Sequence, residues 1–241
     1  MNNFPYNGVF AGTTLIQQSG SIGGARSVFV KLQGIKNELV YPTFGGQLKN
    51  PFKVPAKIFA GDLFEFRTDN DGVNPSVYLL KTFEVADDVA ESGTTIYIVR
   101  DAYRHIPCVG DVLMAAPADF STQGAGYAIT AVEETVHASK AVWEVTIGTT
   151  LGALTKGDIL VEAAESGAAV KMLVQNPNSV APSDYDMFLT PTSSATTNNV
   201  NSARYYLTPA LHGIMYKSKM SKMPAVVEGI NKSRINGWFE I

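Results

Sequence analysis

The chain has 241 residues, of which 45% are hydrophobic and only 17% are charged, whereas an ordinary domain carries roughly 25% charged residues. Serine, threonine and asparagine supply 49 residues, and there are 21 glycines and 12 prolines, a composition that favours short strands and many turns over a long helical bundle. A single cysteine, Cys108, excludes an internal disulfide framework and a multi-cysteine zinc site. The absence of a long apolar run and of a signal-like start leads us to expect a protein that folds in a reducing cytoplasm.

Charge is divided unevenly along the chain. Residues 1–60 hold six Lys/Arg and one acid, residues 61–203 hold seven Lys/Arg and 19 acids, and residues 204–241 hold six Lys/Arg and two acids. The net charge of −3 therefore conceals two basic ends and an acidic middle. The basic ends are candidates for contact with another surface, or they fold back on the acidic part of the same chain.

In chain order, residues 1–25 are rich in Asn, Gly, Gln and Ser without periodicity, which predicts an extended arm. Beyond residue 26, short apolar or alternating runs predict strands. The expected strands are 27–33, 56–66, 77–85, 94–100, 111–115, 127–135, 141–147, 158–163 and 169–175.

Three Gly-Asp pairs stand before apolar runs, at Gly61-Asp62, Gly110-Asp111 and Gly157-Asp158, with spacings of 49 and 47 residues. We expect each glycine to occupy a turn position with positive φ, and each aspartate to bond its own backbone and fix the turn. The recurrence indicates an internal repeat of a turn and a strand, although Gly-Asp is common in turns and two matched spacings can arise by chance.

The segments around these pairs also correspond. Residues 94–114 align without gaps on 141–161, 47 positions apart, and 78–85 align on 127–134, 49 positions apart. We therefore predict two repeat units, at 26–118 and 119–175. The fold class is mainly β, with small antiparallel β-barrels or sandwich-like domains.

The last part of the chain differs in character. Residues 176–203 are polar and contain three prolines, which predicts a loop or linker. Residues 204–241 are expected to be partly helical. Thr208-Pro209 is typical of a helix N-cap followed by proline, and a second helix is predicted from Pro224.

Motifs for common enzyme chemistry are missing from the sequence. It has no phosphate-binding Gly-x-x-x-x-Gly-Lys-Ser/Thr loop, no Gly-x-Gly-x-x-Gly and no Gly-x-Ser-x-Gly elbow. His105, His137 and His212 lie far apart and lack metal-ligand spacing. His105 is close enough in sequence to Cys108 to act as its base, but a small apolar residue beside a turn is the better interpretation of Cys108.

Acidic residues give equally weak signals. Asp69-Asn70-Asp71-Gly72 has calcium-loop character but lacks the closing glutamate, so a tight turn is expected there. Glu133 and Glu134 are neighbours on a predicted strand and should point to opposite faces. We therefore expect no catalytic residues, no metal and no cofactor, and the chain is predicted not to be an enzyme; a small polysaccharide-cleaving enzyme is the least favoured class.

The runs Ala60–Phe64, Val109–Leu113 and Lys156–Leu160, each a small residue, Gly-Asp and an apolar stretch, carry a family resemblance. They resemble the strand starts of auxiliary capsid (head decoration) proteins, and of related head-fibre base proteins, of tailed bacteriophages. The resemblance covers about residues 25–175. It implies a non-enzymatic virion protein that is assembled in the host cytoplasm, binds the capsid exterior and reinforces the shell.

The implied partners are the major capsid protein and other virion proteins, with a homo-oligomer, preferably a trimer, and neither nucleic acid nor membrane. Basic residues near the C-terminus are the candidate docking residues: Lys217, Lys219, Lys222, Lys232 and Arg234. The alternative is a fibre or tail-associated protein that binds a host receptor or glycan through aromatic side chains. The aromatics considered for that role are Trp143, Tyr205, Tyr206 and Trp238.

Overall fold

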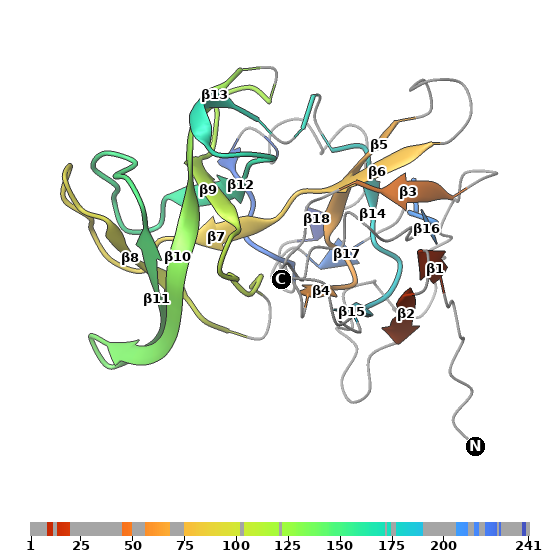
Figure 1. Cartoon of the computed structure of the whole chain (residues 1–241), viewed down its shortest axis with the longest axis horizontal. Coiled ribbons are helices and arrows are strands. Elements are labelled where there is room, and N and C mark those ends of the chain that lie inside the picture. Colours follow the sequence, from red (N-terminus) through yellow and green to blue (C-terminus); the bar gives the residue numbers. More distant parts are fainter. Residues whose placement is uncertain are drawn as a thin grey trace. The chain divides into compact units, whose positions relative to one another are not determined.

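A computed structural model describes residues 9–11, 14–19, 45–49, 56–67, 75–101, 104–120, 122–171, 173–174, 177–189, 206–211, 215–216, 220–225, 227 and 238–239. In these residues the chain is mainly β, as predicted, and only Ala225 and Val227 are helical (Figure 1). The chain forms two compact units. Unit 1 comprises residues 1–79, 177–220 and 230–241, and unit 2 comprises 80–176 and 221–229.

Unit 2 is built on a long hairpin, β10 and β11 (green in Figure 1), and shorter strands around it. Its strands are β7 (Thr82–Glu84), β8 (Thr95–Val99), β9 (Val112–Ala115), β10 (Gly124–His137), β11 (Lys140–Ile147), β12 (Ile159–Glu162) and β13 (Gly167–Val170). Six of them pair antiparallel in the order β7-β12-β9-β10-β11-β8, and β13 pairs with β10.

Of the barrels or sandwich-like domains that the sequence predicts, a barrel is wrong for unit 2. The sheet of unit 2 is not closed into a barrel, since its ladder ends at β7 and β8. An isolated bridge between Val85 and Ile98 joins these two ends, because β7 stops before Val85 and the chain then turns away. The side chains between these strands form the core of unit 2, which excludes water and supplies most of its stabilisation. The buried members are Phe83, Val85, Val89, Ile96, Ile98, Leu113, Ile129, Val145, Ile147, Leu154 and Leu160.

The strand register of unit 2 repeats itself at a spacing of 47 residues. Thr95 of β8 lies opposite Thr146 of β11, and 47 positions further on Val142 of β11 lies opposite Val99 of β8. The pairing of β9 with β12 shows the same exchange of partners at a spacing of 47 residues. The gap-free alignment of residues 94–114 on 141–161 therefore matches residues in equivalent positions. The two aligned segments are related by an approximate twofold symmetry, in which each takes the place of the other.

The other alignment, at a spacing of 49, is wrong. Phe83 of β7 lies opposite Leu160, and Tyr127 of β10 lies opposite Leu113. Because Leu160 and Leu113 are equivalent, Phe83 matches Tyr127, a spacing of 44. The cause is that the predicted strand 77–85 is two strands, β6 (Ser76–Leu79) in unit 1 and β7 in unit 2.

The described residues of unit 1 form three further sheets. Its remaining strands are β1 (Val9–Ala11), β2 (Thr14–Ser19), β3 (Gly46–Leu48), β4 (Ala56–Ile58), β5 (Leu63–Arg67), β14 (Ser179–Val180), β15 (Tyr185–Leu189), β16 (Tyr206–Leu207), β17 (Met215–Tyr216) and β18 (Trp238–Phe239). The sheet orders are β1-β2-β15-β4, β14-β5-β6-β3-β16 and β17-β18. Two pairs, β3 with β6 and β17 with β18, are parallel, so the expectation of purely antiparallel sheets is corrected there.

The compact units follow boundaries other than the predicted ones. Residue 118 falls between β9 and β10, which pair with each other inside unit 2. The predicted arm, residues 1–25, contains β1 and β2, and β2 pairs with β15. The predicted polar loop 176–203 contributes β14 and β15; its residues 190–203, and the predicted strand 27–33, lie outside the described residues.

Of the two helices predicted near the C-terminus, one is wrong and the other begins at the predicted residue. A helix from Thr208-Pro209 is wrong, because Ala210 and Val180 exchange two backbone hydrogen bonds of 2.8 Å and form a β-bridge. At Pro224 the chain does begin a helical turn, in which the amide of Val227 donates to the Pro224 carbonyl at 3.0 Å.

Candidate functional site

The three Gly-Asp pairs form three copies of one turn. In each copy the Asp amide donates to the carbonyl three residues earlier, at 2.9–3.0 Å, which closes a four-residue β-turn. The glycines at its third position have φ values of 84° at Gly61, 90° at Gly110 and 92° at Gly157. Because the residue before each glycine does not have a positive φ, a positive φ at the third position identifies a type II turn, and the predicted role of glycine is confirmed.

The aspartate locks the turn with its side chain. Its Oδ2 accepts a hydrogen bond from the backbone N–H of the first turn residue, at 2.7 Å in the turns of Asp62 and Asp158 and at 2.8 Å in that of Asp111. This was the predicted role of the aspartate. The bonded atoms are the N–H groups of Phe59, Cys108 and Thr155.

Each turn is also joined to a distant strand of its own unit by two backbone bonds. The glycine N–H donates to the carbonyl of a residue within a strand or directly after one, and that residue's N–H donates to the Asp carbonyl, all at 2.8–2.9 Å. The receiving residues are Ala181, Ile129 and Val85. The sequence signal thus marks points where the chain is held to a partner strand, a function that local spacing could not reveal.

The turn at Asp111 differs from the other two because a buried lysine contacts its aspartate. The Lys81 Nζ lies 2.5 Å from Asp111 Oδ2, and the two residues are 4% and 0% exposed. Glu162, the last residue of β12, is also buried, and its amide donates to the Lys81 carbonyl at 3.0 Å. We call Lys81, Asp111 and Glu162 the ionic cluster.

Electrostatics favour the charged form of Lys81 while Asp111 and Glu162 are both ionised. Burial by itself lowers the pKa of Lys81, but the negative charges of Asp111 and Glu162 outweigh it and leave the pKa above its usual range. A buried ion pair costs desolvation energy, so its presence is not explained by stability alone.

The equivalent position in the other half of unit 2 has no such cluster. Asp158 is exposed and locks its turn unaided. By the strand registers, Ala125 stands where Lys81 stands and Ala115 where Glu162 stands. The cluster is therefore an addition to the turn and not a requirement of it. Sequence reasoning missed it; the available signal was a lysine inside the apolar run 79–83.

The Cys108–His105 pair, already disfavoured from the sequence, receives no support from the geometry. His105 is 1% exposed, and its Nδ1 accepts the backbone N–H of Thr82 at 3.0 Å. Burial raises the pKa of the Cys108 thiol; the charges of Asp111 and Glu162 add to this, and that of Lys81 opposes it. A thiol held protonated is a poor nucleophile.

His137 and the neighbouring acids Glu133 and Glu134 lie nearer the surface of unit 2. His137 pairs with Asp87, Nε2 to Oδ2 at 2.6 Å, and stacks on Tyr97 with ring centres 3.9 Å apart. Glu133 and Glu134 are successive residues of β10, opposite Glu144 and Trp143 of β11. As predicted, their side chains therefore lie on opposite faces of the sheet. His212 and Asp69–Gly72 lie outside the described residues.

The candidate docking residues are mostly outside the described part. Lys222 is described and exposed, whereas Lys217, Lys219, Lys232 and Arg234 are not described. Among the aromatics proposed for sugar binding, Trp143 packs partly buried against the core of unit 2, and Arg100 lies 5.0 Å from its ring centre. Tyr205 lies outside the described residues, and of Tyr206 and Trp238 only the strand positions are described.

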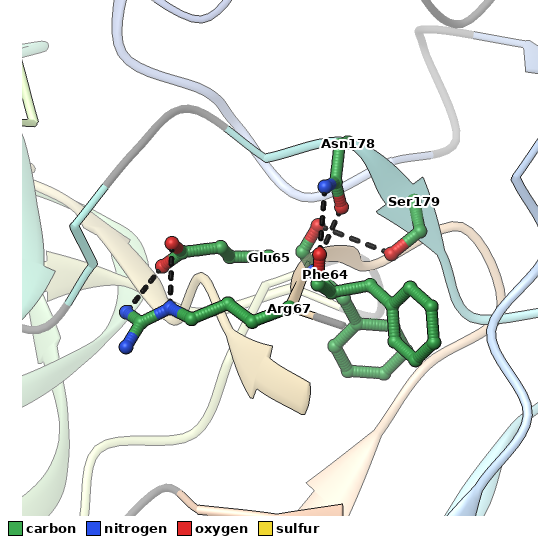
Figure 2. Close-up of polar contacts among 6 residues, drawn as sticks. Phe64, Glu65, Arg67, Asn178 and Ser179 are labelled. Atoms are coloured by element: carbon green, nitrogen blue, oxygen red, sulfur yellow. Dashed lines mark hydrogen bonds and ion pairs between the residues drawn. The ribbon is translucent and has the colours of Figure 1, made fainter. Parts of the chain in front are cut away.

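Unit 1 has its own buried polar network on β5 (Figure 2). The Asn178 side chain acts like a ladder partner, because its Oδ1 accepts from the Phe66 N–H at 2.7 Å and its Nδ2 donates to the Phe66 carbonyl at 2.8 Å. On the same strand Glu65, which is fully buried, receives two bonds of 2.7 Å from Arg67, whose guanidinium stacks on Tyr78. The Asn178 bonds hold the β14 segment to β5, and the Glu65–Arg67 pair lies on β5 against Tyr78 of β6.

No group of three or more His, Cys, Asp or Glu residues in the described part of the chain is arranged to hold a metal ion. Within the same residues, no helix has the length and apolar character needed to cross a membrane. Comparison with protein-family models, with curated proteins and with solved structures gives no match.

Proposed function

We propose that this chain is a non-enzymatic structural protein of a virion, which binds the outer surface of a phage capsid and reinforces the shell. The observation that supports this most is the distribution of charge between the compact units. Unit 2 holds seven Lys/Arg against 14 Asp/Glu, a net charge of −7, whereas unit 1 holds twelve against eight, a net charge of +4. A basic unit and an acidic unit suit a protein that attaches by one part and exposes the other.

The internal chemistry is consistent with such a role. The three Gly-Asp turns and the network on β5 are used to hold strands together. A protein that reinforces a lattice acts through many copies and many modest interfaces, so rigid, well-connected units are more useful to it than a mobile cleft. In this proposal the partner is the major capsid protein, and the protein forms a homo-oligomer, with a trimer favoured.

An add-back experiment tests the proposal. Particles that lack the protein are incubated with purified chain, and bound protein and the temperature of particle disruption are measured. Binding together with greater resistance to heat is expected. Failure to bind, or binding without any change in resistance, contradicts the proposal.

A charge-matched pair of variants identifies the attaching unit. Lys217→Glu with Lys219→Glu reverses two charges in unit 1, and Lys140→Glu with Lys156→Glu reverses two exposed charges in unit 2. The first pair is expected to lose binding with unchanged melting, and the second to keep it. Loss of folding in the first pair would instead show that the basic residues contact the chain's own acidic part.

A further inference from the structure

The ionic cluster of unit 2 combines an amine, a carboxyl group and a second carboxyl group in a buried position. A charge-assisted N–H···O bond is ordinarily about 2.7–2.9 Å long, and the Lys81 Nζ–Asp111 Oδ2 separation of 2.5 Å is shorter. The Asp111 Cγ is one covalent bond beyond that oxygen. Amine and carboxyl carbon are therefore held in near-attack proximity, a condition that greatly raises the effective concentration of two reacting groups.

The two oxygens of Asp111 have different surroundings. Oδ2 accepts the Cys108 N–H at 2.8 Å and locks the turn, whereas the buried Oδ1 accepts no hydrogen bond from any described residue. An acceptor left unsatisfied in this way is costly. Loss of Oδ1 would remove that cost and leave the turn intact.

We propose that Lys81 and Asp111 are joined by an amide bond between Nζ and Cγ, which the folded unit forms by itself with Glu162 as the proton acceptor. The Glu162 carboxylate takes a proton from the Lys81 ammonium, and the neutral amine attacks Asp111 Cγ. The C–Oδ1 bond then breaks. Two ammonium protons leave with Oδ1 as water, one of them by way of Glu162, and the third stays on the amide nitrogen.

This reaction is balanced without an oxidant, a metal or a cofactor. The positive charge of Lys81 and the negative charge of Asp111 disappear together, and a buried ion pair is replaced by a neutral amide whose remaining oxygen is already hydrogen-bonded. The burial of both groups favours the neutral product, since Lys81 is 4% and Asp111 0% exposed and charge is costly away from water.

The bond would connect the residue before β7 to the turn before β9, across a loop of about thirty residues. The other half of unit 2 offers an internal contrast, because Ala125 and Ala115 stand there in place of the lysine and the glutamate. The inference does not depend on the proposed function: a protein that never binds a capsid can carry the bond.

Peptide mapping of the purified full chain tests it. If the bond is present, trypsin cannot cut after Lys81, and a species appears in which peptide 68–100 is joined to peptide 105–140 with the loss of one water. If instead peptides 68–81 and 82–100 are recovered and no linked species exists, the proposal is overturned. Loss of water by cyclisation at Asp71-Gly72 is distinguished because it leaves 105–140 separate.

Single substitutions test Lys81 as the reacting amine and Glu162 as the proton acceptor. Lys81→Met is expected to abolish the linked species. Glu162→Gln is expected to abolish or greatly reduce it while circular dichroism shows a folded protein, and Glu165→Gln, an exposed glutamate three residues away, is expected to keep it. A linked species at the wild-type level in Glu162→Gln overturns the assignment of Glu162. Should either variant fail to fold, the wild-type peptide map still decides whether the bond exists.

Discussion

Removing the aspartate from two equivalent turns of unit 2 should have very different consequences. Asp158→Ala deletes one hydrogen bond, from the exposed turn residue Thr155, and should lower the free energy of unfolding by about 1 kcal/mol. Asp111→Ala deletes the same bond in its own turn and also leaves Lys81 buried without its nearest anion.

Of the two losses in Asp111→Ala, removal of the anion beside Lys81 lowers the free energy of unfolding more than removal of the turn hydrogen bond. Breaking a buried pair by removing one partner costs about 3–5 kcal/mol, and Glu162 remains to offset part of it, so we take about 3 kcal/mol. Asp111→Ala should therefore cost at least about 4 kcal/mol, the figure for the ion-paired form, and more where the proposed amide bond has formed, against about 1 kcal/mol for Asp158→Ala. In a Lys81→Met background the cost of Asp111→Ala should fall towards that of Asp158→Ala, because no buried cation is left behind.

Urea unfolding followed by tryptophan fluorescence measures these differences. Trp238 is first replaced by phenylalanine, so that Trp143 reports on unit 2 alone. Equal destabilisation by Asp111→Ala and Asp158→Ala, or an undiminished effect in the Lys81→Met background, would refute the claim that Lys81 and Asp111 are energetically coupled.

Three further predictions follow from local geometry. Gly157→Ala should destabilise unit 2 by about 1–2 kcal/mol because of its φ of 92°, whereas Gly148→Ala, which has equally open surroundings and no positive φ, should be nearly neutral; equal melting temperatures would contradict this. The hydrogen bond from His137 lowers the pKa of Asp87, so its stabilising effect is present above the ordinary carboxyl pKa and lost as pH falls through the lowered one. His137→Phe keeps a ring to stack on Tyr97 and should return the Asp87 pKa to its ordinary range in an NMR titration; an unmoved pKa would exclude the pairing. Because burial raises the pKa of Cys108, iodoacetamide should label it slowly at neutral pH and rapidly only in urea, and fast labelling of the folded chain would disagree.

Local turn chemistry in this chain could be predicted from the sequence, but the partners of the turns could not. A glycine before an aspartate is sufficient to specify a type II turn, and all three pairs form it. The residues that receive the turns, Ala181, Ile129 and Val85, lie 120, 19 and 72 positions from the turn glycines. They carry no motif, because any backbone can supply an N–H and a carbonyl.

Strand boundaries failed where one apolar run served two strands. The run 77–85 was predicted as one strand, but its centre, Leu80-Lys81, belongs to neither β6 nor β7. The same lysine is the key to the ionic cluster, whose other members lie 30 and 81 residues further on. Spacing could not bring these three together, since only the register of β12 with β7 and β9 does so.

The position and copy number of the polypeptide in purified particles test the central claim most directly. Cryo-electron microscopy of virions, with the chain's mass quantified per particle, should show it on the outer capsid surface in copies that match the lattice, with unit 1 against the shell. Its absence from the particle, or its presence only in a tail or fibre at a few copies, would contradict the proposed function.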